Sequence, residues 1–156
     1  MEGFLPTLVQ FKEALSTWAG ELVEVGRHLR PFLAKMFLVL CGGGLGAASR
    51  YGVGLLAARA WGVDFPWGTL AVNLAGCFLI GFLFALADRA RIMTPDMRLF
   101  LITGYLGGLT TFSSFSLETV NAVRAGQGLR ALANVLSNTA GGLALTILGM
   151  RLGGLK

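Results

Sequence analysis

Charged side chains are scarce in this sequence of 156 residues. Asp, Glu, Lys and Arg make up 13% of the chain, against about 25% in soluble domains. Hydrophobic residues make up 54%, and the mean hydropathy is +0.69. A chain with so few charged residues cannot form a polar surface large enough to face water on all sides. The composition therefore predicts an integral membrane protein of one small domain.

Histidine and cysteine are scarce as well, which limits the chemistry available to the chain. His28 is the only histidine, Cys41 and Cys77 lie inside apolar stretches, and no CxxC motif occurs. This pattern argues against a metal site of the His/Cys type and is typical of small buried cysteines. No nucleophile stands with a base and no carboxylates are paired, so we do not expect an enzyme.

The net charge of +5 does not indicate a nucleic-acid partner, because the arginines lie mostly at the ends of apolar stretches, where they anchor to lipid headgroups. Four stretches are long enough to cross a bilayer, at about 36–58, 67–87, 98–123 and 131–151. Thr94 before Pro95 predicts a helix start ahead of the third. We therefore expect an all-α membrane domain with four transmembrane helices over residues 36–153, and no cleavable signal peptide.

Residues 1–35 form a segment with a pattern of its own. Apolar side chains recur every seven residues on two neighbouring rows, which are Leu8, Leu15, Leu22 and Leu29, and Phe4, Phe11, Trp18, Val25 and Phe32. The rows predict one amphipathic helix, with Pro31 at an end or kink. The helix could pair in a coiled coil, but the aromatic rings are bulky for a two-stranded seam. We favour a helix that lies in the lipid–water interface, with balanced charge on its polar face.

The third apolar stretch is interrupted at its centre. Between Gly104 and Ser116 it contains three glycines, two threonines and three serines, which a continuous lipid-facing helix does not need. Irregular backbone at membrane depth is tolerated only where protein buries it or water reaches it. We therefore expect a helix broken at mid-membrane, with freed carbonyls and hydroxyls turned to an interior site.

Polar side chains in the four stretches each have two interpretations. Arg50 is either functional or extends to the headgroups. Asn73 either donates to an anion or bonds another helix, and Glu118 either lines a polar path or pairs with an arginine. Asn134 and Asn138, one turn apart, predict a polar stripe on the fourth span that faces the bundle interior.

The donors expected in this interior are neutral. Amides and hydroxyls can replace water around a small anion, and so can the positive edges of the Phe112 and Phe115 rings, for which packing is the alternative. Carbonyls freed by a broken helix suit a small hard cation. The basic residues that flank the spans number six on one side and three on the other, a weak bias that allows insertion both ways: Lys35, Arg89, Arg91, Arg98, Arg151 and Lys156, against Arg59, Arg124 and Arg130.

Three motifs stand in order across about residues 36–153: GGGLGAASRY at 42–51, GTLAVNLAG at 68–76 and GGLTTFSSF at 107–115. Together they resemble the CrcB/Fluc family of fluoride channels. The resemblance implies an antiparallel, dual-topology homodimer in the inner (plasma) membrane, with two pores that export cytoplasmic fluoride passively. It also implies a structural Na⁺ at the dimer axis, held by the backbone carbonyls of Gly107 and Thr110 from both subunits.

The resemblance further implies an anion path lined by Asn73, Thr111, Phe112, Ser113, Ser114, Phe115, Ser137, Asn138, Arg50 and Glu118. The family often has Thr where this chain has Ser114, which keeps the hydroxyl, and the stripe of the fourth span varies within it. Residues 1–35 have no counterpart that we expect in the family. Two other functions stay open: a small dual-topology proton-coupled antiporter, with Glu118 as its membrane acid, and a scaffold that transports nothing.

Overall fold

The computed structural model describes residues 4–90 and 93–154, and the side chains of residues 11–88 and 93–154. Every regular element in this part of the chain is helical. The chain divides into two compact units, Met1–Phe37 and Leu38–Lys156. Some side chains used in the predictions lie outside the described residues, namely those of Phe4, Leu8, Arg89, Arg91 and Lys156.

Helix α1 spans Phe4–Trp61 and has Pro31 inside it. Pro31 was expected to end or kink a helix, and the helix does not end there. A proline withdraws one N–H from the helical ladder, and the leucines and alanines on both sides of it favour helix. The helix ends at Trp61, ahead of a turn in which Gly62 has φ +77°.

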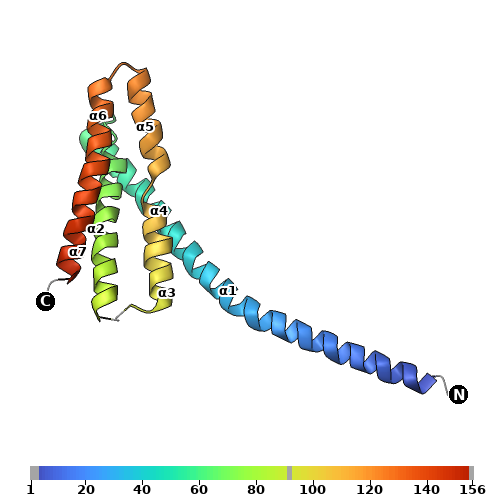
Figure 1. Cartoon of the computed structure of the whole chain (residues 1–156). Helices are drawn as coiled ribbons and strands as arrows, with labels where there is room; N and C mark the ends of the chain where they lie inside the picture. Colours follow the sequence, from blue (N-terminus) through green and yellow to red (C-terminus); the bar gives the residue numbers. More distant parts are fainter. Residues whose placement is uncertain (1–3, 91–92, 155–156) are drawn as a thin grey trace. The chain divides into compact units, whose positions relative to one another are not determined.

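The second unit places the remaining elements in three further crossings (Figure 1). Helix α2 spans Trp67–Ala90. The third crossing is built from four pieces: α3 (Pro95–Arg98), the π-helical η1 (Leu99–Leu106), α4 (Gly107–Leu109) and α5 (Phe112–Arg124). The fourth consists of α6 (Gly128–Leu136), the π-helical turn η2 (Ser137–Gly141) and α7 (Gly142–Gly154).

Among the described residues, three helices are long and apolar enough to cross a membrane: Phe11–Trp61, Trp67–Asp88 and Gly128–Gly154. In the sequence, the pieces of the third crossing stand between the second and third of these helices. With these pieces counted as one further stretch, the all-helical structure fits the expected four-helix fold class. The predicted start of the third stretch is confirmed, because the Thr94 side chain accepts the N–H of Met97 at 3.2 Å.

Glycines set the spacing between the crossings of the second unit. Helices α2 and α7 lie side by side (Figure 1), and a Cβ added at Gly149 would stand 2.9 Å from the backbone N of Phe82. Gly42 of α1 lies equally close to the third crossing, since a Cβ added at this glycine would stand 2.9 Å from the backbone N of Tyr105. Such contacts let helix backbones approach closely where lipid offers no hydrophobic driving force.

Candidate functional site

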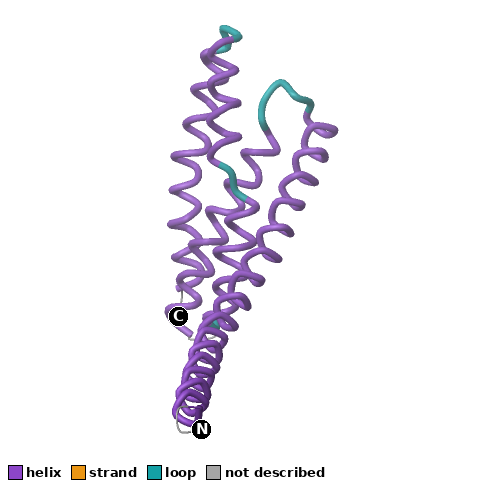
Figure 2. The backbone as a smooth tube through the Cα atoms, turned by 90° about the vertical axis from the view of Figure 1, so that its right-hand side faces the viewer, coloured by secondary structure: helices purple, strands orange, loops and turns teal. Residues whose placement is uncertain are grey.

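The helical hydrogen bonding of the third crossing stops at two threonines. Helix α4 ends at Leu109, Thr110 (φ −80°, ψ 154°) and Thr111 (φ −151°, ψ 113°) are extended, and α5 begins at Phe112. Figure 2 shows this interruption as a short loop between two helical stretches. Thr111 caps the second stretch, because its Oγ1 accepts the N–H of Ser114 at 3.2 Å. The sequence predicts a break between Gly104 and Ser116, and both extended residues lie in that range.

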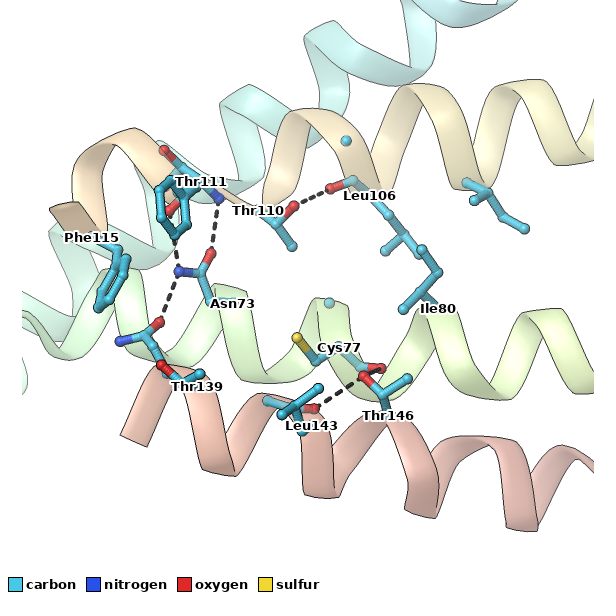
Figure 3. Close-up of a pocket in the computed structure, with 16 residues that line it drawn as sticks. Asn73, Cys77, Ile80, Leu106, Thr110, Thr111, Phe115, Thr139, Leu143 and Thr146 are labelled. Atoms are coloured by element: carbon cyan, nitrogen blue, oxygen red, sulfur yellow. Dashed lines mark hydrogen bonds between the residues drawn. The ribbon is translucent and has the colours of Figure 1, made fainter. Parts of the chain in front are cut away.

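Asn73 of α2 completes the backbone bonding at the interruption. Its Oδ1 accepts the N–H of Thr111 at 2.8 Å, and its Nδ2 donates to the Thr111 carbonyl at 3.2 Å, as Figure 3 shows. In a continuous helix the Thr111 N–H would donate to the carbonyl of Gly107, four residues earlier. Asn73 therefore replaces a helical hydrogen bond, and the Gly107 carbonyl loses its helical donor.

A row of amides leads from Asn73 to the fourth crossing. Asn73 Nδ2 also donates to Asn138 Oδ1 at 2.9 Å, and Asn138 Nδ2 donates to Asn134 Oδ1 at 2.9 Å. Asn134 Nδ2 donates in turn to Thr119 Oγ1 at 2.9 Å, and the Thr119 hydroxyl donates to the Phe115 carbonyl at 2.8 Å. Asn134 is only 2% exposed, so water cannot replace the bonds that it makes.

A single backbone N–H fixes the direction of this row. Because an N–H can only donate, the Asn73 atom that faces the Thr111 nitrogen must be Oδ1, and this turns the amide nitrogen toward Asn138. Asn138 then presents its own oxygen to Asn73 and its nitrogen to Asn134. Every amide in the row accepts on one side and donates on the other, so turning one of them breaks the bonds of its neighbours.

A cavity of about 520 Å³ lies between α2, the third crossing and the η2–α7 segment, and Figure 3 shows the residues that line it. Aliphatic side chains such as Ile80 and Leu143 form much of the wall. Its polar edge holds Asn73, Thr111 and Asn138. The first cavity is therefore an apolar space with neutral hydrogen-bonding groups at one edge.

The two phenylalanines of the third crossing also line the first cavity. The ring centroids of Phe112 and Phe115 are 5.4 Å apart, with an angle of 56° between the planes. Phe112 is 79% exposed, whereas Phe115 is half-buried. The predicted hydroxyls gather at the same turn, since Thr111 Oγ1 lies 3.2 Å from Ser113 Oγ and 3.1 Å from Ser114 Oγ.

A second cavity of about 430 Å³ lies beside the α1–α2 and α5–α6 turns, with Glu118 in its wall. Thr69 Oγ1 donates to Glu118 Oε1 at 2.6 Å, while Glu118 Oε2 is buried without a hydrogen-bond partner in the described part of the chain. Arg130 of the same cavity is 3.6 Å from the Asp64 carboxylate. Glu118 thus bonds a hydroxyl, and the arginine of this cavity pairs with Asp64.

The amide row joins the two cavities. Asn73 and Asn138 line the first cavity, and Asn134, which bonds Asn138, lines the second. Between the two spaces, the described structure thus offers a continuous series of polar atoms through an aliphatic bundle.

Arg50 reaches the interruption from α1. Its Nη1 donates to the Thr110 carbonyl at 3.3 Å, and the side chain is half-buried. The guanidinium therefore bonds the extended backbone at the interruption, and a functional role for Arg50 stays a prediction.

Three hydroxyls beside the site were not among the predicted site residues. Thr119 ends the amide row, Thr69 bonds Glu118, and Thr139 lines the first cavity next to Asn138. Ser137, which was predicted, opens the η2 turn ahead of Asn138. A threonine on the face of a predicted polar stripe is a signal that its hydroxyl contacts the site. Only the packing of the crossings shows which hydroxyl meets which amide.

A family model described as CrcB-like protein, Camphor Resistance (CrcB), matches residues 37–150. The chain belongs to the CrcB family. The CrcB match covers the interruption, the amide row and both cavities, while residues 1–36 lie outside it. The resemblance drawn from the three sequence motifs is confirmed.

Several CrcB relatives carry the name fluoride-specific ion channel FluC. The protein of Agrobacterium fabrum (strain C58) is 48% identical over 122 residues, which cover 78% of this chain and 97% of that protein. The protein of Salinibacter ruber is 45% identical over 119 residues, with 75% and 87% covered. That of Legionella pneumophila (strain Paris) is 43% identical over 119 residues, with 76% and 86% covered.

Proposed function

We propose that this protein is a passive, fluoride-selective channel that exports cytoplasmic fluoride across the inner (plasma) membrane. The names of its relatives support this activity. The observation that carries the proposal is the row Asn73–Asn138–Asn134, which connects two cavities through an aliphatic bundle. A small anion that enters such a bundle leaves its water behind. Neutral donors in the bundle must then take the place of that water.

The longer of the two hydrogen bonds that Asn73 Nδ2 donates lies at the interruption. Asn73 Nδ2 donates to the Thr111 carbonyl at 3.2 Å and to Asn138 at 2.9 Å, so the longer bond is the one that fluoride would exchange for its own. The ring edges of Phe112 and Phe115 carry partial positive charge. The Ser113 and Ser114 hydroxyls can rotate to donate. A larger anion would be held less closely by these donors.

A second, antiparallel copy of the chain is part of the proposal. Gly107 and Phe112, on either side of the interruption, are both exposed in the single chain. A carbonyl that has lost its helical donor, as that of Gly107 has, cannot face lipid, because an unpaired polar group there would cost several kcal/mol. A second copy against this face would cover the interruption and give one path on each side of the dimer. The weak bias of flanking charge permits the opposite insertion that such a dimer needs.

We include a structural Na⁺ between the two copies. The Gly107 carbonyl has lost its helical donor to Asn73, and the Thr110 carbonyl follows the helical stretch that ends at Leu109. Carbonyls at the C-terminal end of an interrupted helix suit a small cation. Arg50 occupies one lone pair of the Thr110 carbonyl and a second remains. When bound, the ion would supply positive charge that links the two interruptions.

Growth in fluoride tests the proposal in cells. A bacterial strain that lacks its own fluoride exporter should grow in otherwise inhibitory fluoride when it expresses this protein. The same strain should fail to grow when it expresses the Asn73→Asp variant at an equal level in the membrane. Equal sensitivity of cells with and without the wild-type protein would contradict the proposal.

A further inference from the structure

The first unit carries a broad apolar face on residues 11–37. At 100° per residue its members fall within a sector of about 140°, and none of them is charged: Phe11, Ala14, Leu15, Trp18, Ala19, Leu22, Val25, Gly26, Leu29, Phe32, Leu33, Met36 and Phe37. The large side chains from Phe11 to Leu33 on this face are between 49% and 69% exposed. We call this face the N-terminal stripe. It is too continuous to be a scatter of single surface hydrophobes.

The length of α1 places the stripe beside a membrane. The apolar helix Phe11–Trp61 has 51 residues, whereas about 20 residues cross the hydrocarbon core. The CrcB match begins at residue 37, after which the channel's own first crossing follows. About half of the helix therefore lies outside the hydrocarbon core while joined to a segment inside it. The lipid surface is thus the apolar phase within reach of the stripe.

The chemistry of the stripe suits a lipid surface better than a second helix. Phe11, Trp18 and Phe32 stand on one row of the stripe, where a two-stranded coiled coil would need smaller branched side chains. Aromatic rings, and tryptophan above all, favour the level of the headgroups. On the polar face Arg27 pairs with Glu24 at 3.0 Å.

The charges of the segment show which lipids are needed. Residues 11–37 contain four basic side chains and three acidic ones, a net charge of +1 from 4 − 3: Lys12, Arg27, Arg30 and Lys35 against Glu13, Glu21 and Glu24. Electrostatic attraction to anionic lipid is therefore small, and burial of apolar area must supply the binding. We propose that residues 11–33 lie along the lipid–water interface of even a zwitterionic bilayer, with the N-terminal stripe turned to the acyl chains; this requires α1 to change direction between the stripe and the first crossing. This inference does not depend on which ion the channel carries.

Tryptophan quenching in the full-length protein tests the orientation. The protein is reconstituted in phosphatidylcholine liposomes, with or without lipid brominated near the headgroup end of its chains, and is also titrated with aqueous iodide. The signal of Trp18 is the difference between wild type and W18F. The matched control is the double variant W18F/S16W, whose new ring stands two residues away and about 200° around the helix. Trp61 and Trp67 are present in all three proteins and cancel in the differences.

The brominated lipid and iodide should quench the two tryptophan positions, 18 and 16, in opposite orders. Because opposite faces of an interfacial helix differ in depth by about 10 Å, the brominated lipid should quench the Trp18 signal at least about twofold more than the S16W signal. Iodide should show the reverse order, and raising the salt concentration should change neither. The variant L22E should reduce lipid quenching of Trp18, while T17E on the polar face should not.

Two outcomes would overturn the inference. In the first, iodide reaches Trp18 as readily as the S16W ring and lipid quenches neither, so the segment stands in water. In the second, both quenchers fail to reach Trp18 and its signal depends on the protein-to-lipid ratio, so the stripe is covered by another copy of the chain.

Discussion

The backbone N–H of Thr111 donates to Oδ1 of Asn73 at 2.8 Å, in place of the helical bond that it would make to Gly107. The contact joins two features that the sequence shows separately, an asparagine in one apolar stretch and an interruption in another. It gives the extended backbone a partner, frees a carbonyl and fixes the direction of an amide row. Changes at Asn73 should therefore affect transport more than they affect folding.

Asn73→Asp should abolish fluoride flux and leave the protein folded. The carboxylate can still accept the Thr111 N–H, but it cannot donate to Asn138 and it adds a negative charge to the proposed path of an anion. Asn73→Ala, which adds no charge, should reduce flux less severely. Flux from reconstituted liposomes, with size-exclusion profiles as the folding control, measures the difference. Wild-type flux through Asn73→Asp would remove Asn73 from the path.

Asn134→Leu should lower fluoride flux by roughly 10- to 100-fold, because leaving buried polar partners unsatisfied costs about 1–3 kcal/mol. The change keeps the number and branching of the non-hydrogen side-chain atoms, but it removes the donor to Thr119 and the side-chain acceptor for Asn138. Asn121→Leu is the matched control, since Asn121 lies exposed on α5 in the wall of the second cavity but outside the amide row. If both variants conducted like wild type, the amide row would be a packing feature without a role in transport.

Gly42→Ala should destabilise the protein, whereas Gly44→Ala should not. A Cβ at Gly42 would stand 2.9 Å from the N of Tyr105, while a Cβ at Gly44 would have no neighbour within 4 Å among the described residues. Elsewhere in a helix the same substitution stabilises by about 0.5–1 kcal/mol, so the two variants should differ in sign. Thermal unfolding in detergent reports the result, and equal stability of the two variants would contradict the close approach of the first and third crossings.

An imposed proton gradient should drive no accumulation of a lipophilic cation in liposomes that contain the protein. Glu118 is the only membrane acid that an antiporter of this kind could use, and its Oε1 is held by the Thr69 hydroxyl at 2.6 Å. Cation uptake that follows the proton gradient and disappears in Glu118→Gln would instead support the antiporter.

Local chemistry made much of the molecule predictable from sequence. The apolar stretches predicted the crossings, and Thr94 before Pro95 predicted the start of the third crossing. The hydroxyls and glycines between Gly104 and Ser116 indicated where the helix of that crossing stops. These features depend on neighbours in the chain, so a single sequence contains them.

Contacts between distant segments could not be predicted in the same way. Asn134 and Thr119 both belong to recognisable polar faces, but their hydrogen bond depends on how the third and fourth crossings pack. The bond between Thr69 and Glu118 joins residues 49 positions apart for the same reason. Pro31 was predicted to end or kink a helix. The helix does not end there, because helix formers stand on both sides of the proline, and a kink stays a prediction.

The central claim is that the interrupted third crossing and its amide row carry fluoride passively. The most direct measurement is ion efflux from liposomes loaded with equal concentrations of potassium fluoride and potassium chloride, with valinomycin added to balance charge and separate electrodes for the two anions. The account predicts rapid fluoride efflux while chloride stays inside, with both anions retained when Asn73→Asp replaces the wild type. Retention of fluoride by the wild-type protein, or release of both anions together, would contradict it.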